Sequence, residues 1–272
     1  MMPSYSKNSG ESGELLVKAK LVKMMVEGHS FCDGSKINQI DAGDFKSKDG
    51  VYTYNQDIDA SAVYEVCESG ADYDYERIRD ILDPLYIVKA GSRMKADVSI
   101  NKTNYSIKSS KSKPAIINHT FRNGFSIAAK YANVNLNFLD TEIMRYWENR
   151  VAENIGEDVS GKSRKKHNLF WSDDFKEKFR PIFNYFAFTG SGAALSKKPA
   201  DLVLEFANPL DPSSWKIMTP DTFYDTCWVD LIFSIRNKKD KIETVDSLSK
   251  ENRIWARKIN GKIRGRLHVR AG

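Results

Sequence analysis

The sequence has few cysteines and no long apolar segment, and each absence argues against a class of protein. Its three cysteines are far apart and form no CxxC or CxxH pair, so neither a disulfide framework nor a zinc site is supported. No stretch reaches the roughly 18 apolar residues that a membrane span needs, and the first residues lack the apolar core of a secretory signal. We therefore expect a soluble, cytoplasmic protein with no membrane partner.

Common catalytic signatures are missing as well. The chain contains no GxSxG element, no GxxxxGKS phosphate loop and no HExxH zinc motif. With 272 residues, 41% of them apolar, it can bury a sizeable core. We expect one domain over 1–272, with 1–56 as a helical and loop-rich N-terminal extension and 250–272 as a basic C-terminal hairpin or tail.

Positive charge is concentrated in two segments. The chain carries a formal charge of +6, and residues 250–272 hold eight Lys or Arg against one acid, so this segment carries +7 and the rest −1. A second cluster, GKSRKKHNLFW at 161–171, contains Lys162, Arg164, Lys165 and Lys166. Such clusters are expected of a protein with a polyanion partner, most often nucleic acid. The alternative is a solvated tail and loop.

Hydrophobic periodicity predicts helices and strands in alternation. The expected helices are 14–28, ended by Gly28; 57–68; 74–82; the stretch from Asp140 to Gly156, capped by Asp140 or Thr141; and an aromatic helix over 174–190, broken or begun anew at Pro181. The expected strands are YIVKAG, ADVSI, YSIKSS, PADLVLEF (199–206), CWVDLIFSIR (227–236) and a closing hairpin around Gly261 and Gly265. Residues 29–56 are expected to be loop. The order predicts an α/β fold with a mixed central sheet flanked by helices.

The stretch MKADVSINKTNYSIKSSK (94–111) contains an acid and an amine in adjacent strand patterns. Because strand side chains alternate between faces, a hairpin turning at 101–104 would bring Asp97 and Lys108 to the same face of neighbouring strands. A carboxylate and an amine in this arrangement would suit a site in which a metal ion binds a water molecule. The alternative is a solvated surface pair that contributes less than about 1 kcal/mol to stability.

An aspartate followed about ten residues later by x-Lys resembles the core of the PD-(D/E)xK nuclease superfamily, here in a D-x(n)-SxK form. The longer stretch, KADVSI leading into YSIKSSKSKPAIINHTFRNGF, is similar to type II restriction endonucleases of that superfamily. The resemblance implies a restriction-endonuclease-like fold and hydrolysis of phosphodiester bonds in double-stranded DNA. It also implies that Asp97 binds a catalytic Mg²⁺, with the Ile107 carbonyl as another ligand, and that Lys108 orients or helps to deprotonate the attacking water.

This sequence departs from the family pattern at two positions: Ser106 stands where the family has Asp or Glu, and Ala96 where it has Pro. Mg²⁺ prefers oxygen ligands, with one or two carboxylates from the protein. Some SxK members of the superfamily take the missing carboxylate from a neighbouring helix. The candidates for this second carboxylate are Glu142, which we favour because it follows the motif, and Glu148, Glu76 and Asp80.

Other residues are candidates for DNA contacts or for a rival site. His119 and Arg122, in INHTFRNGF, could read bases or hold phosphate, and Arg264 and Arg266 belong to the basic tail. Asp201 and Glu205 share a strand face and offer a rival carboxylate pair, although no lysine follows at the family's spacing. The predicted function is a Mg²⁺-dependent, sequence-specific DNA endonuclease; the alternatives are a nucleic-acid-binding protein without catalysis and a structure-specific junction or repair nuclease. A palindromic target would imply a homodimer.

Overall fold

The computed structural model describes residues 9–46, 48–111, 115–152, 172–237 and 244–271, and the chain folds into two compact units. Unit 1 contains Met1–Ser112 and Ser196–Pro220, and unit 2 contains Lys113–Leu195 and Asp221–Gly272. We predicted one domain with two appendages. Residues from 1–56 instead contribute a helix and two strands to unit 1, and residues from 250–272 contribute three strands to unit 2.

Unit 1 is built on a six-stranded mixed sheet with the order β2-β1-β3-β4-β6-β7. Strands β4 and β6 pair in parallel, and the other neighbours are antiparallel. The strands are β1 (Gln39–Asp41), β2 (Val51–Thr53), β3 (Val98–Ile100), β4 (Thr103–Ser109), β6 (Leu202–Phe206) and β7 (Trp215–Met218). The predicted α/β class with a mixed sheet is therefore confirmed.

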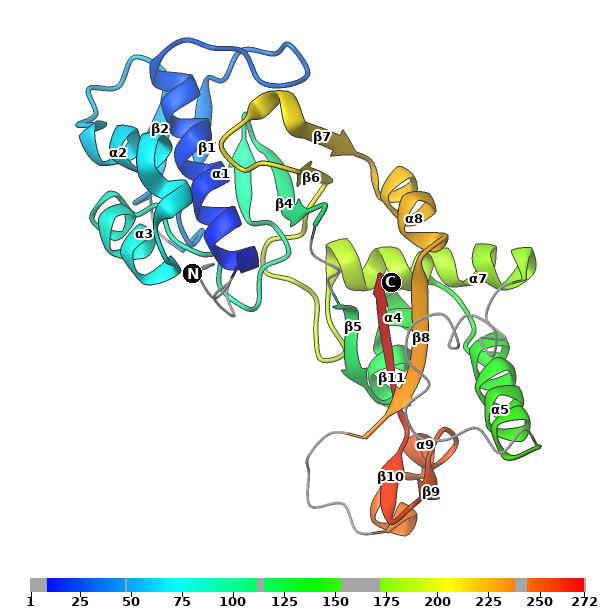
Figure 1. The fold of residues 1–272 in the computed structure, drawn as a ribbon. Coiled ribbons are helices and arrows are strands. Elements are labelled where there is room, and N and C mark those ends of the chain that lie inside the picture. The colour runs from blue at the N-terminus through cyan, green and yellow to red at the C-terminus, as the bar shows by residue number, and fades with distance from the viewer. Residues whose placement is uncertain (1–8, 47, 112–114, 153–171, 238–243, 272) are drawn as a thin grey trace. The chain divides into compact units, whose positions relative to one another are not determined.

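Helix α1 (Ser9–Val26) forms much of the core of unit 1. Its Val17, Ala19, Leu21 and Val22 are fully buried, and Leu204 and Ile107 of the sheet belong to the same core. A helix that is apolar on most of its circumference has to be buried. Helices α2 (Ser61–Ser69) and α3 (Tyr75–Leu82), which correspond to the helices expected over 57–68 and 74–82, pack beside α1 in Figure 1.

A buried ion pair connects α1 to the segment that leads into β3. Lys18 is 0% exposed; its ammonium donates hydrogen bonds to Glu14 Oε1 (2.8 Å) and to the carbonyl of Val88 (2.6 Å). Glu14 Oε1 also accepts a hydrogen bond from the Ala90 amide (3.1 Å). We expected YIVKAG to be a strand. It is irregular because these backbone groups bond to side chains of α1 instead of to a neighbouring strand.

The β3–β4 hairpin forms as predicted, with a tighter turn. Asn101 and Lys102 have positive φ (49° and 72°), the geometry of a two-residue turn that matches the twist of the flanking strands. Asn101 Oδ1 accepts hydrogen bonds from the amides of Asn38 and Gln39, which places β1 beside the hairpin. The predicted loop 29–56 therefore contains strands β1 and β2, each too short to show an alternating pattern.

Unit 2 contains a three-stranded antiparallel sheet in the order β5-β11-β8, a separate β9–β10 hairpin, and helices. The strands are β5 (Ala115–Thr120), β8 (Leu231–Arg236), β9 (Arg257–Ile259), β10 (Lys262–Arg264) and β11 (Arg266–Ala271). The helices are α4 (Arg122–Ala132), α5 (Asn137–Ala152), α7 (Asp173–Asn184), α8 (Pro220–Trp228) and α9 (Lys250–Arg253). The predicted closing hairpin is confirmed as β9–β10.

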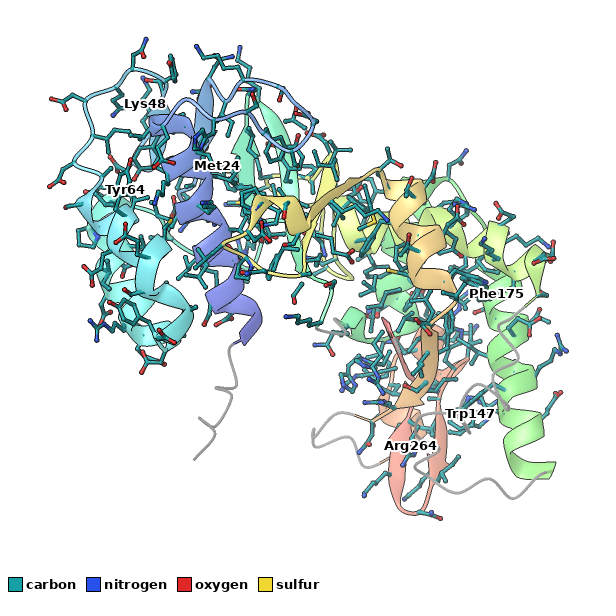
Figure 2. The ribbon with its side chains drawn as sticks, turned by 45° about the horizontal axis from the view of Figure 1, so that its top comes forward. Met24, Lys48, Tyr64, Trp147, Phe175 and Arg264 are labelled. Atoms are coloured by element: carbon teal, nitrogen blue, oxygen red, sulfur yellow. The ribbon has the colours of Figure 1, made fainter. Side chains whose placement is uncertain are left out.

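Aromatic side chains fill the core of unit 2. Phe175 stacks on Phe179, and both rings contact Phe233 of β8 edge-on. Phe125 of α4 contacts the buried ring of Trp255. Figure 2 labels Phe175 and Trp147, which carry this aromatic packing from α7 and α5. Ring pairs of this kind add stability beyond the area that they bury.

Three predicted elements of unit 2 need correction. Helix α7 continues through Pro181 and is followed by a π-helical turn, η3 (Tyr185–Thr189), where we expected a break. Cys227 and Trp228 end helix α8, so the strand predicted over 227–236 begins only at Leu231; an apolar run alone does not separate a buried helix end from a strand. Helix α5 begins at Asn137, before the expected cap. Gly156 lies outside the described residues.

Among the described residues, no helix is both long enough and apolar enough to cross a membrane.

Lys18 provides a test of the buried pair. The variant Lys18→Met should lose about 3–5 kcal/mol of unfolding free energy, because Glu14 would remain in the core without the ammonium that offsets its desolvation. The double variant Glu14→Gln/Lys18→Met should lose less, since no unpaired charge remains. Urea denaturation measures both, with Lys20→Met at a half-buried position of the same helix as the control. A Lys18→Met protein as stable as the Lys20→Met control would contradict this role of the pair.

Candidate functional site

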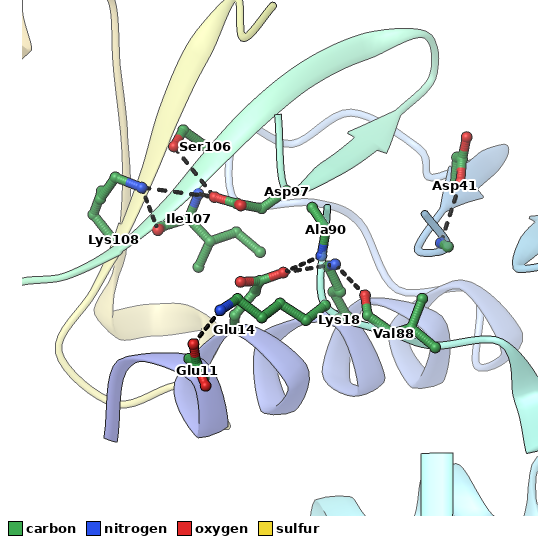
Figure 3. A network of polar contacts seen from close by, with 12 residues as sticks. Glu11, Glu14, Lys18, Asp41, Val88, Ala90, Asp97, Ser106, Ile107 and Lys108 are labelled. Carbon is green, nitrogen blue, oxygen red and sulfur yellow. Dashed lines mark hydrogen bonds and ion pairs between the residues drawn. The ribbon is translucent and has the colours of Figure 1, made fainter. Parts of the chain in front are cut away.

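The β3–β4 hairpin brings Asp97 and Lys108 together in unit 1. Asp97 directly precedes β3, and its amide donates to the carbonyl of Tyr105 on β4 (2.8 Å). The ammonium of Lys108 lies 3.7 Å from Asp97 Oδ2, and the two side chains are 31% and 18% exposed, with Asp97 the more buried. The predicted proximity is confirmed. Figure 3 shows both side chains turned toward each other beside Ser106 and Ile107.

Asp97 is oriented by hydrogen bonds from β4 to one of its two carboxylate oxygens. Oδ2 accepts hydrogen bonds from the Ile107 amide (2.7 Å) and from the Ser106 hydroxyl (3.2 Å), and it forms an ion pair with the ammonium of Lys108. Within the described part of the chain, Oδ1 accepts no hydrogen bond. The strand therefore fixes the carboxylate and leaves one oxygen able to bind a further partner.

Ser106 is 2% exposed, and its hydroxyl points at Asp97. At the position where the resembled superfamily has an acid, this chain thus has a buried hydrogen-bond donor. The neighbouring carbonyl of Ile107 accepts from Lys108 Nζ at 3.1 Å. Lys108 consequently contacts both oxygen atoms, Asp97 Oδ2 and Ile107 O, that the resemblance assigned as ligands of a metal ion.

Glu14 is a second carboxylate near Asp97 that sequence reasoning missed. Burial raises the pKa of Glu14, the charge of Lys18 lowers it, and the negative charge of Asp97 raises it further. In Figure 3 the Glu14 carboxylate lies between α1 and the hairpin that carries Asp97. The available signal was Lys18 within an apolar run with an acid four residues before it, a spacing that pairs side chains on a helix.

Lys95 is the other residue that the sequence did not single out. Its amide donates to Ser196 Oγ (2.9 Å) and to the carbonyl of Lys198 (3.0 Å), so its backbone is fixed by the chain that leads into β6. Burial, and then the charge of Lys108, lower the pKa of Lys95 to about 8, while Asp97 acts in the opposite direction. Two amines therefore share the surroundings of one aspartate, which makes this part of unit 1 attractive to an anion.

The structure assigns other partners to several predicted carboxylates. Glu142, the favoured second metal ligand, lies in unit 2 and accepts hydrogen bonds from Arg145, three residues further along α5. Glu76 and Asp80 are exposed on α3, where Asp80 pairs with Arg79, and Glu148 is exposed on α5. No group of three His, Cys, Asp or Glu side chains in the described ranges could hold a metal.

The rival carboxylate pair lies on the same sheet as Asp97. Asp201 Oδ2 accepts from the Asn104 amide (2.9 Å) beside the hairpin turn. Glu205 of β6 is the register partner of Lys108 on β4 and of Lys216 on β7. Lys108 and Glu205 are therefore neighbours across the parallel pair of β4 and β6. Their spacing in the sequence did not predict this.

The predicted DNA contacts fall into different environments. Arg122 donates to both oxygens of Asp140 and to Glu251, and Arg264 is 7% exposed on β10. Arg266 lies over the ring of Phe121, with 4.2 Å between guanidinium carbon and ring centre, and the His119 ring contacts that of His268 at a tilt of 34°. The basic cluster with Lys162, Arg164, Lys165 and Lys166 lies outside the described residues.

Comparisons with protein-family models, with curated proteins and with solved structures found no match. The function of this chain is therefore argued from the residues around Asp97 and from the placement of its charges.

Ser106 allows a metal test that does not depend on catalysis. Ser106→Asp restores the acid of the resembled motif beside Asp97, and without Mg²⁺ the two buried carboxylates should repel and lower stability by about 1–3 kcal/mol. Added Mg²⁺ should restore most of that loss by binding between them. Thermal melts in EDTA and in Mg²⁺ measure the effect, with Ser109→Asp further along β4 as the control. If the thermal stability of Ser106→Asp is the same in EDTA and in Mg²⁺, Asp97 does not form a metal site.

Proposed function

We propose that this chain is a Mg²⁺-dependent endonuclease that hydrolyses phosphodiester bonds in double-stranded DNA, with the site and fold type of restriction endonucleases. One observation carries the proposal. The ammonium of Lys108 reaches both Asp97 Oδ2 (3.7 Å) and Ile107 O (3.1 Å), so a carboxylate, a carbonyl and an amine converge on one small region. An ordinary surface ion pair needs no such convergence.

The donor atoms around Asp97 fit Mg²⁺ better than a softer metal ion. They are oxygen atoms, one from a carboxylate and one from a backbone carbonyl, which are the ligands that Mg²⁺ prefers. Asp97 and the Ile107 carbonyl would hold the ion. When bound, Mg²⁺ would lower the pKa of a water molecule and polarise the phosphate.

The residues of the chain have separate roles in this proposal. The Ile107 amide and the Ser106 hydroxyl hold the Asp97 carboxylate in one orientation. Lys108 orients the attacking water and, with its positive charge, stabilises the negative charge that builds up on the phosphate oxygens. Lys95 adds a second positive charge near Lys108 and Asp97. Glu14 stays paired with Lys18, so it brings little net negative charge to the site.

Two further features support the proposal. In unit 1, Asp97 directly precedes β3 and Lys108 lies on its antiparallel neighbour β4, an arrangement that agrees with the motif that the sequence resembles. The positive charge of residues 250–272 suits a DNA partner. That same charge favours the second candidate function, a nucleic-acid-binding protein in which Asp97 and Lys108 have no chemical role.

Incubation with supercoiled plasmid DNA separates the two functions. With Mg²⁺ the endonuclease should produce discrete linear fragments, and with EDTA it should only retard the plasmid in a gel. Retardation without cleavage in Mg²⁺ would leave the binding protein as the better description. A pattern restricted to branched substrates would indicate a structure-specific nuclease.

Variants at the hairpin locate the chemistry. Asp97→Asn and Lys108→Met should each lower the cleavage rate by about 10²–10³-fold or more, because each removes a group that acts on the reacting phosphate. DNA affinity in EDTA and thermal stability should change little. Lys111→Met, at an exposed position beyond β4, is the charge control, and Asp201→Asn tests the rival carboxylate pair. Full activity in Asp97→Asn with loss in Asp201→Asn would move the site to the rival pair.

A further inference from the structure

One face of the sheet in unit 1 packs in the core with α1, and the other face carries Lys108. Ile107 of β4 and Leu204 and Phe206 of β6 belong to the core that α1 forms. Because strand side chains alternate, Lys108 and Glu205 point to the opposite face. The two residues are register partners on parallel strands, which lie about 4.8 Å apart. Glu205 is therefore the direct neighbour of Lys108 on this face.

Charges of alternating sign follow one another across this part of the sheet. Asp97 precedes β3, Lys108 lies on β4, Glu205 on β6 and Lys216 on β7. Lys108 pairs with Asp97 at 3.7 Å. Within the described ranges of the chain, the half-buried carboxylate of Glu205 accepts no hydrogen bond and forms no ion pair. It is therefore open to a charged partner, although a lysine lies beside it on each side.

The present contacts of Lys108 conflict with binding of a metal ion at Asp97. Its ammonium lies 3.7 Å from Asp97 Oδ2 and 3.1 Å from the carbonyl oxygen of Ile107, as Figure 3 shows. Lys108 cannot keep both contacts once these oxygens hold a divalent cation, because like charges repel strongly at such short range where water is partly excluded. A metal site here therefore requires a second position for the ammonium.

We propose that Glu205 is a positioning residue, which receives the ammonium of Lys108 when Asp97 and the Ile107 carbonyl hold the metal ion. The inference rests on the proposed function for the presence of that ion. A lysine carries its charge on a flexible four-carbon stem, so the ammonium can turn from β3 toward β6 without a change in the backbone. Opposite charges on neighbouring strands stabilise each other, which gives the second position its own partner.

Other groups near the hairpin do not compete for these roles. Glu14 is paired within helix α1, and Asp201 Oδ2 accepts a hydrogen bond from the Asn104 amide at 2.9 Å. Lys216, the other neighbour of Glu205, is exposed and forms no ion pair with it. Glu205 therefore remains able to accept the ammonium that leaves Asp97.

The test titrates Mg²⁺ alone into the DNA-free protein and follows the melting temperature, which rises as the native state binds the ion. Glu205→Gln should weaken Mg²⁺ binding by about three- to tenfold, because the ammonium then has no partner away from the metal ligands. In a Lys108→Met background, the same Glu205→Gln change should alter binding by less than about twofold, since no ammonium has to move.

Three further measurements serve as controls. Asp97→Asn should abolish the rise in melting temperature, which assigns the binding to this site. Glu76→Gln removes an exposed carboxylate of α3 in the same unit and should bind Mg²⁺ like the wild type. In EDTA, Glu205→Gln should melt like the wild type, because the described residues give Glu205 no partner to lose. That agreement shows that weaker Mg²⁺ binding does not come from misfolding.

Two results would overturn the inference directly. One is equal Mg²⁺ binding by Glu205→Gln and the wild type. The other is an equal loss with and without Lys108, because Glu205 would then act on the ion itself, as a ligand or through its charge.

Plasmid cleavage separates this inference from the endonuclease. A wild type that cuts, while Glu205→Gln binds Mg²⁺ normally, would refute the role of Glu205 and leave the endonuclease. A wild type that never cuts, but shows the predicted dependence of Mg²⁺ binding on Glu205 and Lys108, would refute the endonuclease and support the role of Glu205. If the melting temperature of the wild type shows no rise that depends on Asp97, the inference is wrong, whereas cleavage by the same protein would still support the endonuclease.

Discussion

The buried ion pair between Glu14 and Lys18 is the interaction on which the candidate site depends. It satisfies the Val88 carbonyl and the Ala90 amide, which lie in an irregular segment, and so holds the chain that leads to Asp97 against helix α1. An ion pair inside a core adds little net stability, because desolvating both charges offsets their attraction. Its effect is instead conformational, since the two side chains hold Val88 and Ala90 of this segment through hydrogen bonds to the backbone.

That fixed path explains how a short hairpin can bring several polar groups together. The Ile107 amide binds Asp97 at 2.7 Å, and Ser106 and Lys108 reach the same carboxylate oxygen from β4. Hydrogen bonds to an ionised group are stronger than those between neutral groups, and here they come from a backbone that the sheet already holds rigid. The remaining carboxylate oxygen is therefore presented in a defined direction, which a solvated surface pair would not provide.

The two units contribute different chemistry to the proposed enzyme. Unit 1 contains the carboxylates and amines of the hairpin, and unit 2 contains the acid-free β5-β11-β8 sheet. The arginines of that sheet come from β8 and β11, which are separated in sequence by the β9–β10 hairpin and helix α9. A count of charges along the sequence detects the positive segment that contains β11. It does not show that Arg236 of β8 lies beside that segment in the sheet.

The sequence by itself determined the features that depend on neighbours along the chain. Helix α1, the hairpin with its Asn101 turn, and the shared face of Asp97 and Lys108 follow from periodicity, turn chemistry and strand alternation. Tertiary structure decided the rest. Only packing shows that Glu14 lies near Asp97, that YIVKAG is not a strand, and that Arg264 is buried while Arg236 pairs with Arg266 across the sheet. These contacts join residues far apart in the chain, and no local pattern encodes them because each depends on which surfaces the core brings together.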